Sequence, residues 1–156
     1  MTLPAQPLKP AVLAAQTDSG YPEPFRSRVL PRDKRALGDA AGLTRIGVNY
    51  TTLAPGVESS MRHWHTHEDE LIYVVSGELV LVTDAGEQKF AAGQCAGFPA
   101  GIENAHQLVN RSGKPAVYLE ISNRDARDAA TYPDVDLRWN APDAPDEYTH
   151  KDGSPY

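Results

Sequence analysis

The chain carries its densest group of potential metal ligands in one stretch, Arg62-His-Trp-His-Thr-His-Glu-Asp-Glu70. On an extended strand, residues two apart point to the same side. His63 and His65 therefore present their imidazoles together, about 7 Å apart along the strand at ~3.3 Å per residue. Glu70 follows after a short break, at the start of an apolar run, where a turn would bring its carboxylate back alongside the histidines. The stretch predicts a chelating site on two neighbouring strands.

Outward from this stretch, short runs typical of β-strands follow one another closely. Upstream, the apolar residues Ile46, Val48 and Tyr50 recur at every second position, the period of a half-buried strand. Turn residues such as Gly77 and Gly93 separate the runs. Many short strands with turns every 8–12 residues or so predict an all-β sandwich or barrel. We expect the further strands at residues 60–65, 71–76, 78–83, 87–90, 94–98, 106–110 and 116–122, and one or two helical turns within 124–130.

A fourth ligand has to come from elsewhere in the barrel, and His106 opens a later strand after the turn Pro99-Ala-Gly101. Three imidazoles and one carboxylate form a nitrogen–oxygen donor set that suits divalent iron, manganese, nickel, cobalt or zinc. The set lacks a thiolate and therefore does not look like a structural zinc finger. An octahedral ion on four protein ligands keeps open positions for water, substrate or dioxygen, as metal catalysis requires.

The spacing of this stretch resembles the first motif of the cupin family, G-x5-H-x-H-x3–4-E-x6-G. The chain has Gly56, six residues, then His63 and His65, four residues, Glu70, six residues and Gly77. Only the first gap departs from the pattern, by one residue.

The second cupin motif, G-x5-P-x-G-x2-H-x3-N, is matched downstream. Its positions are occupied by Gly93, Pro99, Gly101, His106 and Asn110. The departure is the gap between Gly101 and His106, which has four residues instead of two. The two motifs cover residues 56–110, and the resemblance in fold extends from about 43 to 122.

This resemblance implies an all-β cupin double-stranded β-helix, a jelly-roll barrel, with an irregular N-terminal arm and C-terminal tail. It also implies a divalent metal ion (zinc, iron, manganese or nickel) inside the barrel on His63, His65, Glu70 and His106. The chain is similar to bacterial single-domain cupins described as sugar-phosphate-isomerase-like, a group without an assigned activity. Because such cupins frequently pair through their sheets, the resemblance further implies a homodimer.

Composition divides the chain into three parts. We expect an extended arm at residues 1–24, which are rich in proline and alanine, and the barrel at 25–123. Residues 124–156 are irregular and proline-rich, yet they contain Tyr132, Trp139 and Tyr148. Disordered segments are usually poor in aromatic residues, so we expect this tail to pack on the barrel or on a neighbouring subunit.

Charge and cysteine content exclude several classes. The formal net charge of -6 argues against nucleic acid and against an anionic membrane surface as partners. Cys95 is the only cysteine, which favours a reducing, cytoplasmic setting, and we expect its thiol to be buried as a small hydrophobe. With no apolar span long enough to cross a bilayer, we expect a soluble, uncleaved intracellular protein.

Several residues near the motif have two interpretations. His67 shares the parity of His63 and His65 and is their rival, although a solvent-facing turn residue fits the motif spacing better. Glu68 and Asp69 form a charged loop or accept a hydrogen bond from a ligand imidazole. Trp64 is expected to pack against the outside of the barrel, and His150 is expected at the surface. Ile72, Val74 and Leu108 are expected on the pocket wall or in the core.

Two functions fit this sequence. The first is a metal-dependent enzyme acting on a small polar metabolite, a sugar or an organic acid, by dioxygenase, isomerase or lyase chemistry. The second is a module that binds or senses such a molecule without turnover, since one scaffold hosts both. Catalysis normally needs an acid or base beside the metal. The candidates for this acid or base are Tyr50, Tyr73, Tyr118 and Glu120. The sequence does not place any of them in the pocket, so the catalytic residues stay unassigned.

Overall fold

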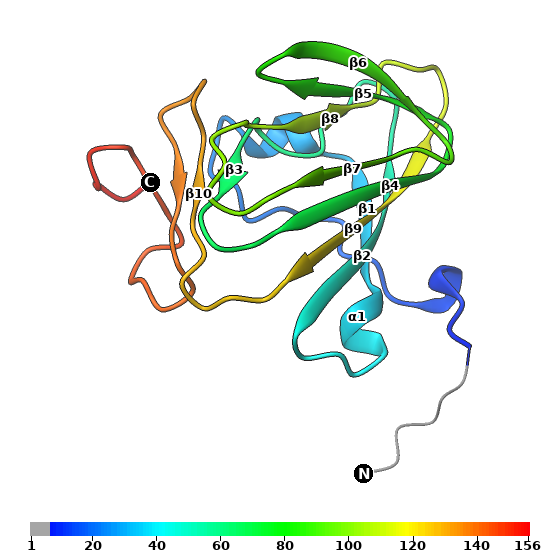
Figure 1. The fold of residues 1–156 in the computed structure, drawn as a ribbon, viewed down its shortest axis with the longest axis horizontal. Helices are drawn as coiled ribbons and strands as arrows, with labels where there is room; N and C mark the ends of the chain where they lie inside the picture. The colour runs from blue at the N-terminus through cyan, green and yellow to red at the C-terminus, as the bar shows by residue number, and fades with distance from the viewer. Residues whose placement is uncertain (1–6) are drawn as a thin grey trace.

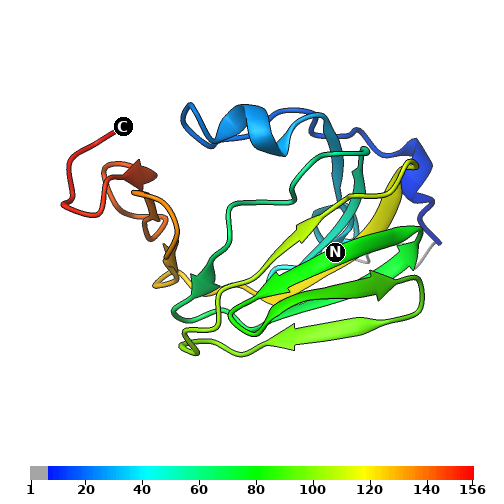
Figure 2. The same cartoon turned by 90° about the horizontal axis from the view of Figure 1, so that it is seen from above.

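A computed structural model describes residues 7–156. Its centre is a pair of antiparallel sheets that enclose one hydrophobic core (Figures 1 and 2). The larger sheet has the order β1-β2-β9-β4-β7, with strands Arg32–Ala36, Ile46–Leu53, Ala116–Asn123, Glu70–Ser76 and Cys95–Phe98. The smaller sheet has the order β6-β5-β8, with strands Gly86–Ala91, Glu78–Thr83 and Gln107–Val109. The predicted all-β barrel is confirmed.

Alternation along β4 shows how the sequence builds the barrel wall. Glu70, Ile72 and Val74 are buried, whereas Leu71 and Tyr73 between them are each 40% exposed. Because successive side chains of a strand point to opposite faces, the first set faces the barrel interior. There Ile72 and Val74 join the main core cluster, whose other members include Leu53, Leu79, Leu81, Phe90, Leu108 and Tyr118.

The hairpin between β4 and β5 depends on Gly77. Its φ of 81° lies in the left-handed region, which favours glycine. A Cβ at this position would lie 2.9 Å from Cα of Ala116, on the neighbouring strand β9. The glycine is therefore required both by the backbone conformation and by the close approach of β9.

Most of the expected strands are present, with three differences. The strand expected at 60–65 is reduced to β3 (Trp64–His65), because residues 58–63 form isolated bridges, such as His63 with His106, in place of a continuous ladder. Residues 124–130 form a turn rather than a helix. The prediction of a buried Cys95 is wrong: Cys95 is exposed, since it lies on the outward face of β7 opposite Tyr73.

A second hydrophobic cluster joins both ends of the chain to the barrel mouth. Tyr21 and Phe25 from the N-terminal part pack with Met61, Tyr132 and Leu137. The tail contains three two-residue strands, and these extend β3 into a four-stranded sheet of order β12-β11-β10-β3. They are Tyr148–Thr149, Arg138–Trp139 and Ala130–Thr131 in that order.

The remaining elements are short. The helix α1 (Leu37–Ala40) follows β1, and two 3₁₀ turns lie at Pro10–Val12 and Arg26–Val29. Of the arm expected at 1–24, residues 1–6 lie outside the described part, and Gln16 forms a bridge with Lys34 of β1. No helix among residues 7–156 is long and apolar enough to cross a membrane.

Candidate metal site and ligand cavity

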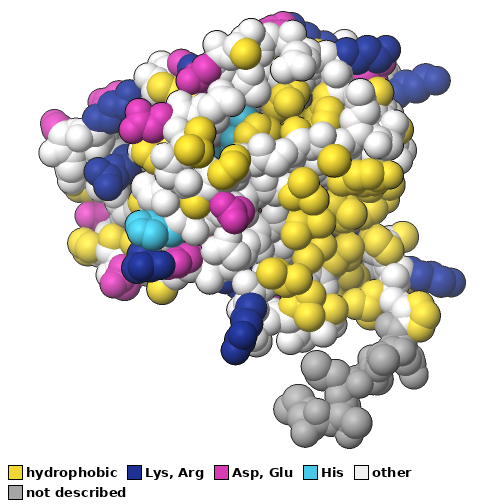
Figure 3. Space-filling view, in the orientation of Figure 1, with side chains coloured by type: hydrophobic (Ala, Val, Ile, Leu, Met, Phe, Trp, Pro, Cys, Tyr) yellow, Lys and Arg dark blue, Asp and Glu magenta, His cyan; other side chains and the backbone are white. Residues whose placement is uncertain are grey.

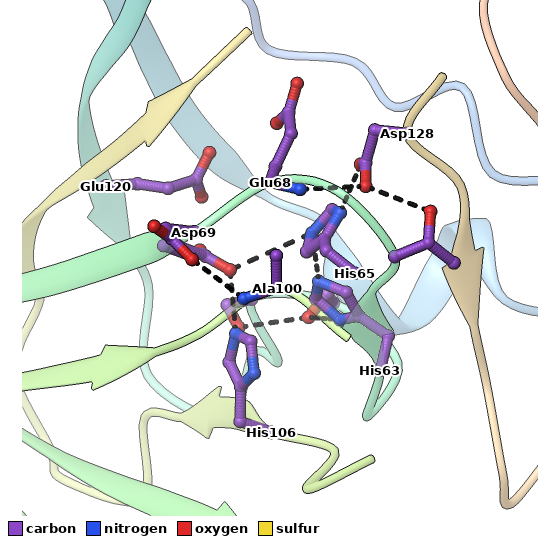
Figure 4. A network of polar contacts seen from close by, with 12 residues as sticks. His63, His65, Glu68, Asp69, Ala100, His106, Glu120 and Asp128 are labelled. Carbon is purple, nitrogen blue, oxygen red and sulfur yellow. Dashed lines mark hydrogen bonds and ion pairs between the residues drawn. The ribbon is translucent and has the colours of Figure 1, made fainter. Parts of the chain in front are cut away.

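The structure brings together the four side chains that the sequence singled out. The Nε2 atoms of His63 and His65 lie 3.2 Å apart, and Nε2 of His106 lies 2.8 Å from Oε2 of Glu70. The same carboxylate oxygen is 3.8 Å from Nε2 of His65. Figure 4 shows the rings of His63, His65 and His106 gathered around one point inside the barrel.

Backbone pairing sets these positions. The peptide groups of His63 and His106 exchange two hydrogen bonds, of 3.0 and 2.8 Å, and so fix these two side chains side by side. Glu70 is the first residue of β4 and points inward with Ile72. The ring of His106 stacks on Phe98, with centroids 3.6 Å apart, which holds the imidazole in a single plane.

The separations fit a shared cation. Ligand atoms at about 2.1 Å from an octahedral ion and at right angles to each other lie about 3.0 Å apart. The observed 3.2 and 2.8 Å are close to that value. Nδ1 of His63 donates to the carbonyl oxygen of Met61 at 2.9 Å, and Nδ1 of His65 donates to Asp128. When both rings are neutral, these contacts leave the Nε2 lone pairs facing each other, an arrangement that a cation between them would stabilise.

Protonation states also fit a metal site. Burial and the adjacent imidazoles of His106 and His65 lower the pKa of His63 to about 3. Burial opposes ionisation of Glu70, but the hydrogen bond from His106 and the nearby histidines outweigh it and lower the pKa of Glu70 to about 2. At neutral pH the site therefore offers a neutral imidazole at His63 and an anionic carboxylate at Glu70, the forms that bind metals.

Asp128 is a buried carboxylate that the sequence reasoning missed. Its Oδ2 lies 2.6 Å from Nδ1 of His65, and its Oδ1 accepts the backbone N–H groups of His67 and Glu68 (Figure 4). The carboxylate expected beside a ligand imidazole was Glu68 or Asp69. Asp69 instead accepts the N–H of Ala100 at 2.8 Å. No local pattern marks Asp128, because it meets His65 only through the pairing of β10 with β3.

His67 and His150 take the peripheral positions expected of them. The side chain of His67 is exposed, with Nδ1 2.8 Å from the hydroxyl of Thr66. His150 pairs with Asp136 at 2.9 Å and stacks on Tyr156. Neither histidine lines the cavity beside the clustered side chains.

A cavity of about 210 Å³ opens beside the four clustered side chains. Of the candidate acids and bases, Tyr118 and Glu120 line it, whereas Tyr73 is 40% exposed on the outer face of the sheet. Ile72 and Leu108 contribute to both the cavity wall and the core. Both terminal regions of the chain supply part of the wall, a contribution that no sequence pattern predicted; the residues are Tyr21, Tyr132, Trp139 and Tyr148.

Comparison with known proteins is consistent with this geometry. The family described as a cupin domain matches residues 49–122. A crystal structure described as a sugar phosphate isomerase from a cupin superfamily, from Silicibacter pomeroyi, is 40% identical, with a TM-score of 0.89. The match covers 97% of this chain and 96% of that one. The chain belongs to the cupin superfamily. None of the curated proteins matches it.

Two further structures extend the comparison of this cupin. A protein from Acidithiobacillus ferrooxidans, provisionally named a sugar phosphate isomerase, is 34% identical over 69% of this chain and 68% of that one, with a TM-score of 0.66. The polyketide cyclase RemF from Streptomyces resistomycificus is 19% identical over 77% of this chain and 80% of that one, with a TM-score of 0.64. The latter shows a shared fold alone.

The one irregular spacing of this cupin leaves the cluster intact. The longer gap between Gly101 and His106 forms a loop that is tied back at its start, where the N–H of Gly101 donates to the carbonyl oxygen of His65 at 2.8 Å. At its end, His106 is fixed by the two backbone bonds to His63. The extra residues therefore lie between two anchored points.

Proposed function

We propose that this cupin binds one divalent metal ion through His63, His65, Glu70 and His106 and acts on a small polar metabolite. The observation that carries the proposal is the convergence of four ligand atoms: Nε2 of His63 and His65 lie 3.2 Å apart, and Oε2 of Glu70 lies 2.8 Å from Nε2 of His106 and 3.8 Å from Nε2 of His65. Three imidazole nitrogens and one carboxylate oxygen suit zinc, iron, manganese or nickel as the ion.

When bound, such an ion supplies a Lewis acid with open positions for a substrate oxygen or for water. The other groups come from the chain. Asp128 holds the ring of His65 in the tautomer that turns Nε2 toward the cluster. Burial raises the pKa of Tyr118 far above its usual range, so its hydroxyl stays protonated and is a hydrogen-bond donor.

Glu120 is the candidate for moving a proton. It lines the cavity from β9, with Oε1 3.1 Å from Nζ of Lys34 and 3.1 Å from Nδ2 of Asn49. We assign Glu120 as the base beside the proposed metal, within a polar wall suited to hydroxyl-bearing substrates.

The names of the two similar proteins support isomerase chemistry on a sugar or a related organic acid over dioxygenase or lyase chemistry. Elemental analysis of protein purified without chelators tests the metal. We expect one equivalent of a divalent transition metal per chain. Metal at trace level only, after supplementation with each candidate ion, would overturn the proposal.

A substrate screen with the metal-loaded protein then separates turnover from binding. The expected result is conversion of an aldose or ketose, or of its phosphate or acid, without consumption of dioxygen. Matched reactions with Glu120→Gln should lose at least about tenfold in rate, the lower range for a general base. Tight binding of a screened sugar with no conversion would assign the barrel to binding or sensing instead.

A further inference from the structure

Arg32, the first residue of β1, places a cation in the cavity wall. β1 pairs with β2 so that Arg32 stands opposite Leu53. Directly opposed residues of antiparallel strands share a face, and Leu53 is fully buried. Arg32 therefore faces the interior, as does Lys34 two residues later, and both line the cavity.

Most of the hydrogen-bonding capacity of Arg32 is unused. A guanidinium carries five N–H groups. Within the described chain, Arg32 makes one side-chain hydrogen bond, from Nη1 to the carbonyl oxygen of Ser59 at 2.8 Å. Nε is buried and has no hydrogen-bond partner. Because nearly all buried donors in native proteins are satisfied, the open Nε–Nη2 edge indicates a partner that residues 7–156 do not supply.

The other charges of the cavity have partners within the chain. Lys34 pairs with Glu120 at 3.1 Å, Glu70 accepts from His106 at 2.8 Å, and Glu68 accepts the N–H of Asp125 at 3.1 Å. Of the two cations that line the cavity from β1, only Arg32 lacks a carboxylate partner in the described part of the chain. Arg32 is therefore a local cationic position in the cavity wall without a counter-ion among the described residues.

The position of Arg32 sets the shape of that anion. Arg32 of β1 and Glu70 of β4 line one cavity from strands that are three steps apart in the sheet order. The cavity of about 210 Å³ is somewhat larger than the ~150 Å³ that accommodates benzene. It therefore suits an extended molecule of roughly ten non-hydrogen atoms, with one end at each wall.

We propose that the cavity takes a small organic anion and that Arg32 binds its carboxylate or phosphate group through the Nε–Nη2 edge. A planar guanidinium edge matches two oxygens of either group in bidentate fashion, which an ammonium does not. The remainder of the ligand extends toward His63, His65 and Glu70. This inference rests on the proposed function and names the substrate class of the same site.

Calorimetric titration at fixed ionic strength tests it with three probes: malate, glycerol 3-phosphate and uncharged glycerol. The wild type is expected to bind at least one of the two anions and not glycerol. Arg32→Gln should weaken that binding about tenfold or more, as for loss of a charge-assisted pair. Arg111→Gln, which removes an exposed arginine paired with Glu87 outside the cavity, should leave it unchanged. Preference for one anion distinguishes carboxylate from phosphate.

Failure of this inference is distinguishable from failure of the metal proposal, because metal content is measured on the same samples. Metal-loaded wild type that binds neither anion at about 10 mM, or Arg32→Gln with unchanged affinity, overturns the role of Arg32 alone. Protein that takes up no metal after supplementation, yet binds an anion through Arg32, overturns the metal proposal alone. Arg32→Gln could lose its fold together with the bond to Ser59, and Arg32→Lys, which keeps the charge, is then the variant to test. Because an ammonium lacks the bidentate edge, Arg32→Lys should bind the anion at least about threefold more weakly than the wild type does.

Discussion

Nδ1 of His65 lies 2.6 Å from Oδ2 of Asp128, a buried carboxylate 63 residues further along the chain. The C-terminal part of the chain therefore orients an imidazole of the proposed metal site. A carboxylate behind a ligand histidine fixes its tautomer and raises its basicity. The tail accordingly contributes to the site as well as to packing.

Replacing Asp128 with asparagine is expected to lower metal affinity about 10- to 100-fold, because the imidazole of His65 loses its orienting charge. Competition with a chelating dye measures this directly. Asp125→Asn is the matched control, since Asp125 belongs to the same turn and its carboxylate pairs with Arg127. Equal affinities for wild type and Asp128→Asn would show that the contact plays no part in metal binding.

The stability of the metal-free protein should depend on pH through this pair. Burial opposes both charges, but their hydrogen bond raises the pKa of His65 from 6.5 and lowers that of Asp128 from 3.8. The raised His65 contributes fully below its unfolded value and loses its contribution as pH rises through the folded pKa. The lowered Asp128 contributes above its unfolded value and loses its contribution as pH falls through the folded pKa.

The free-energy difference between wild type and Asp128→Asn should therefore be largest between about pH 4 and 6.5, the unfolded values of the two groups. Its expected size there is about 1.5–3 kcal/mol, as for a hydrogen bond between charged groups. Urea unfolding in the presence of a chelator, repeated from pH 3 to pH 9, measures it. A difference that stays constant over this range would contradict the assignment of charge to both partners.

Gly77→Ala should destabilise the barrel. At φ 81° an alanine is strained, and its Cβ would lie 2.9 Å from the backbone of Ala116. We expect a loss of about 1–3 kcal/mol, measurable by thermal unfolding. Gly113→Ala is the control, because a Cβ there meets nothing within 4 Å. Similar melting temperatures for both variants would show that the backbone at Gly77 relaxes freely.

The expected homodimer stays a prediction, and the outer face of the five-stranded sheet is its best surface. Outward positions of β2, β9 and β4 carry no charged side chain; they are Ile46, Val48, Tyr50, Thr52, Val117, Leu119, Ile121, Asn123, Leu71, Tyr73 and Val75. Figure 3 shows a continuous hydrophobic area over this sheet. With β7 the face covers roughly 400 Å² from standard strand spacings. Stable interfaces bury ~800 Å² per partner; the segment containing exposed Leu8 and Val12 adds apolar area beyond β1, whose outward Asp33 and Arg35 pair with each other and lie at the edge of the uncharged face.

A second copy of the chain suits this face, because two uncharged, twofold-related surfaces pair without buried charge. Tyr73→Glu should convert a dimer to a monomer in sedimentation velocity, since it buries a charge at the centre of the interface. Ile102→Glu changes a residue that is 55% exposed and lies outside this sheet, and it should leave the dimer intact. A monomeric wild type at micromolar concentration would rule out this interface.

The sequence predicted those features that follow local periodicity. Alternation identified the long strands, and parity with motif spacing identified His63, His65, Glu70 and His106, which the fold brings together. Arg32 and Asp128 were not predicted, for a physical reason. β1 has the polar sequence Arg-Asp-Lys-Arg-Ala, without apolar alternation, and Asp128 lies in a turn. The position of each depends on pairing with a distant strand, which no local pattern reports.

The central claim is that His63 and its three partners hold a metal ion, and metal titration of two matched variants tests it most directly. His63→Gln and His67→Gln remove histidines of the same strand parity, one inside the cluster and one exposed. We predict that His67→Gln binds one equivalent of metal with wild-type affinity, whereas His63→Gln loses stoichiometric binding. Unchanged binding in His63→Gln, or its loss in His67→Gln, would contradict the account.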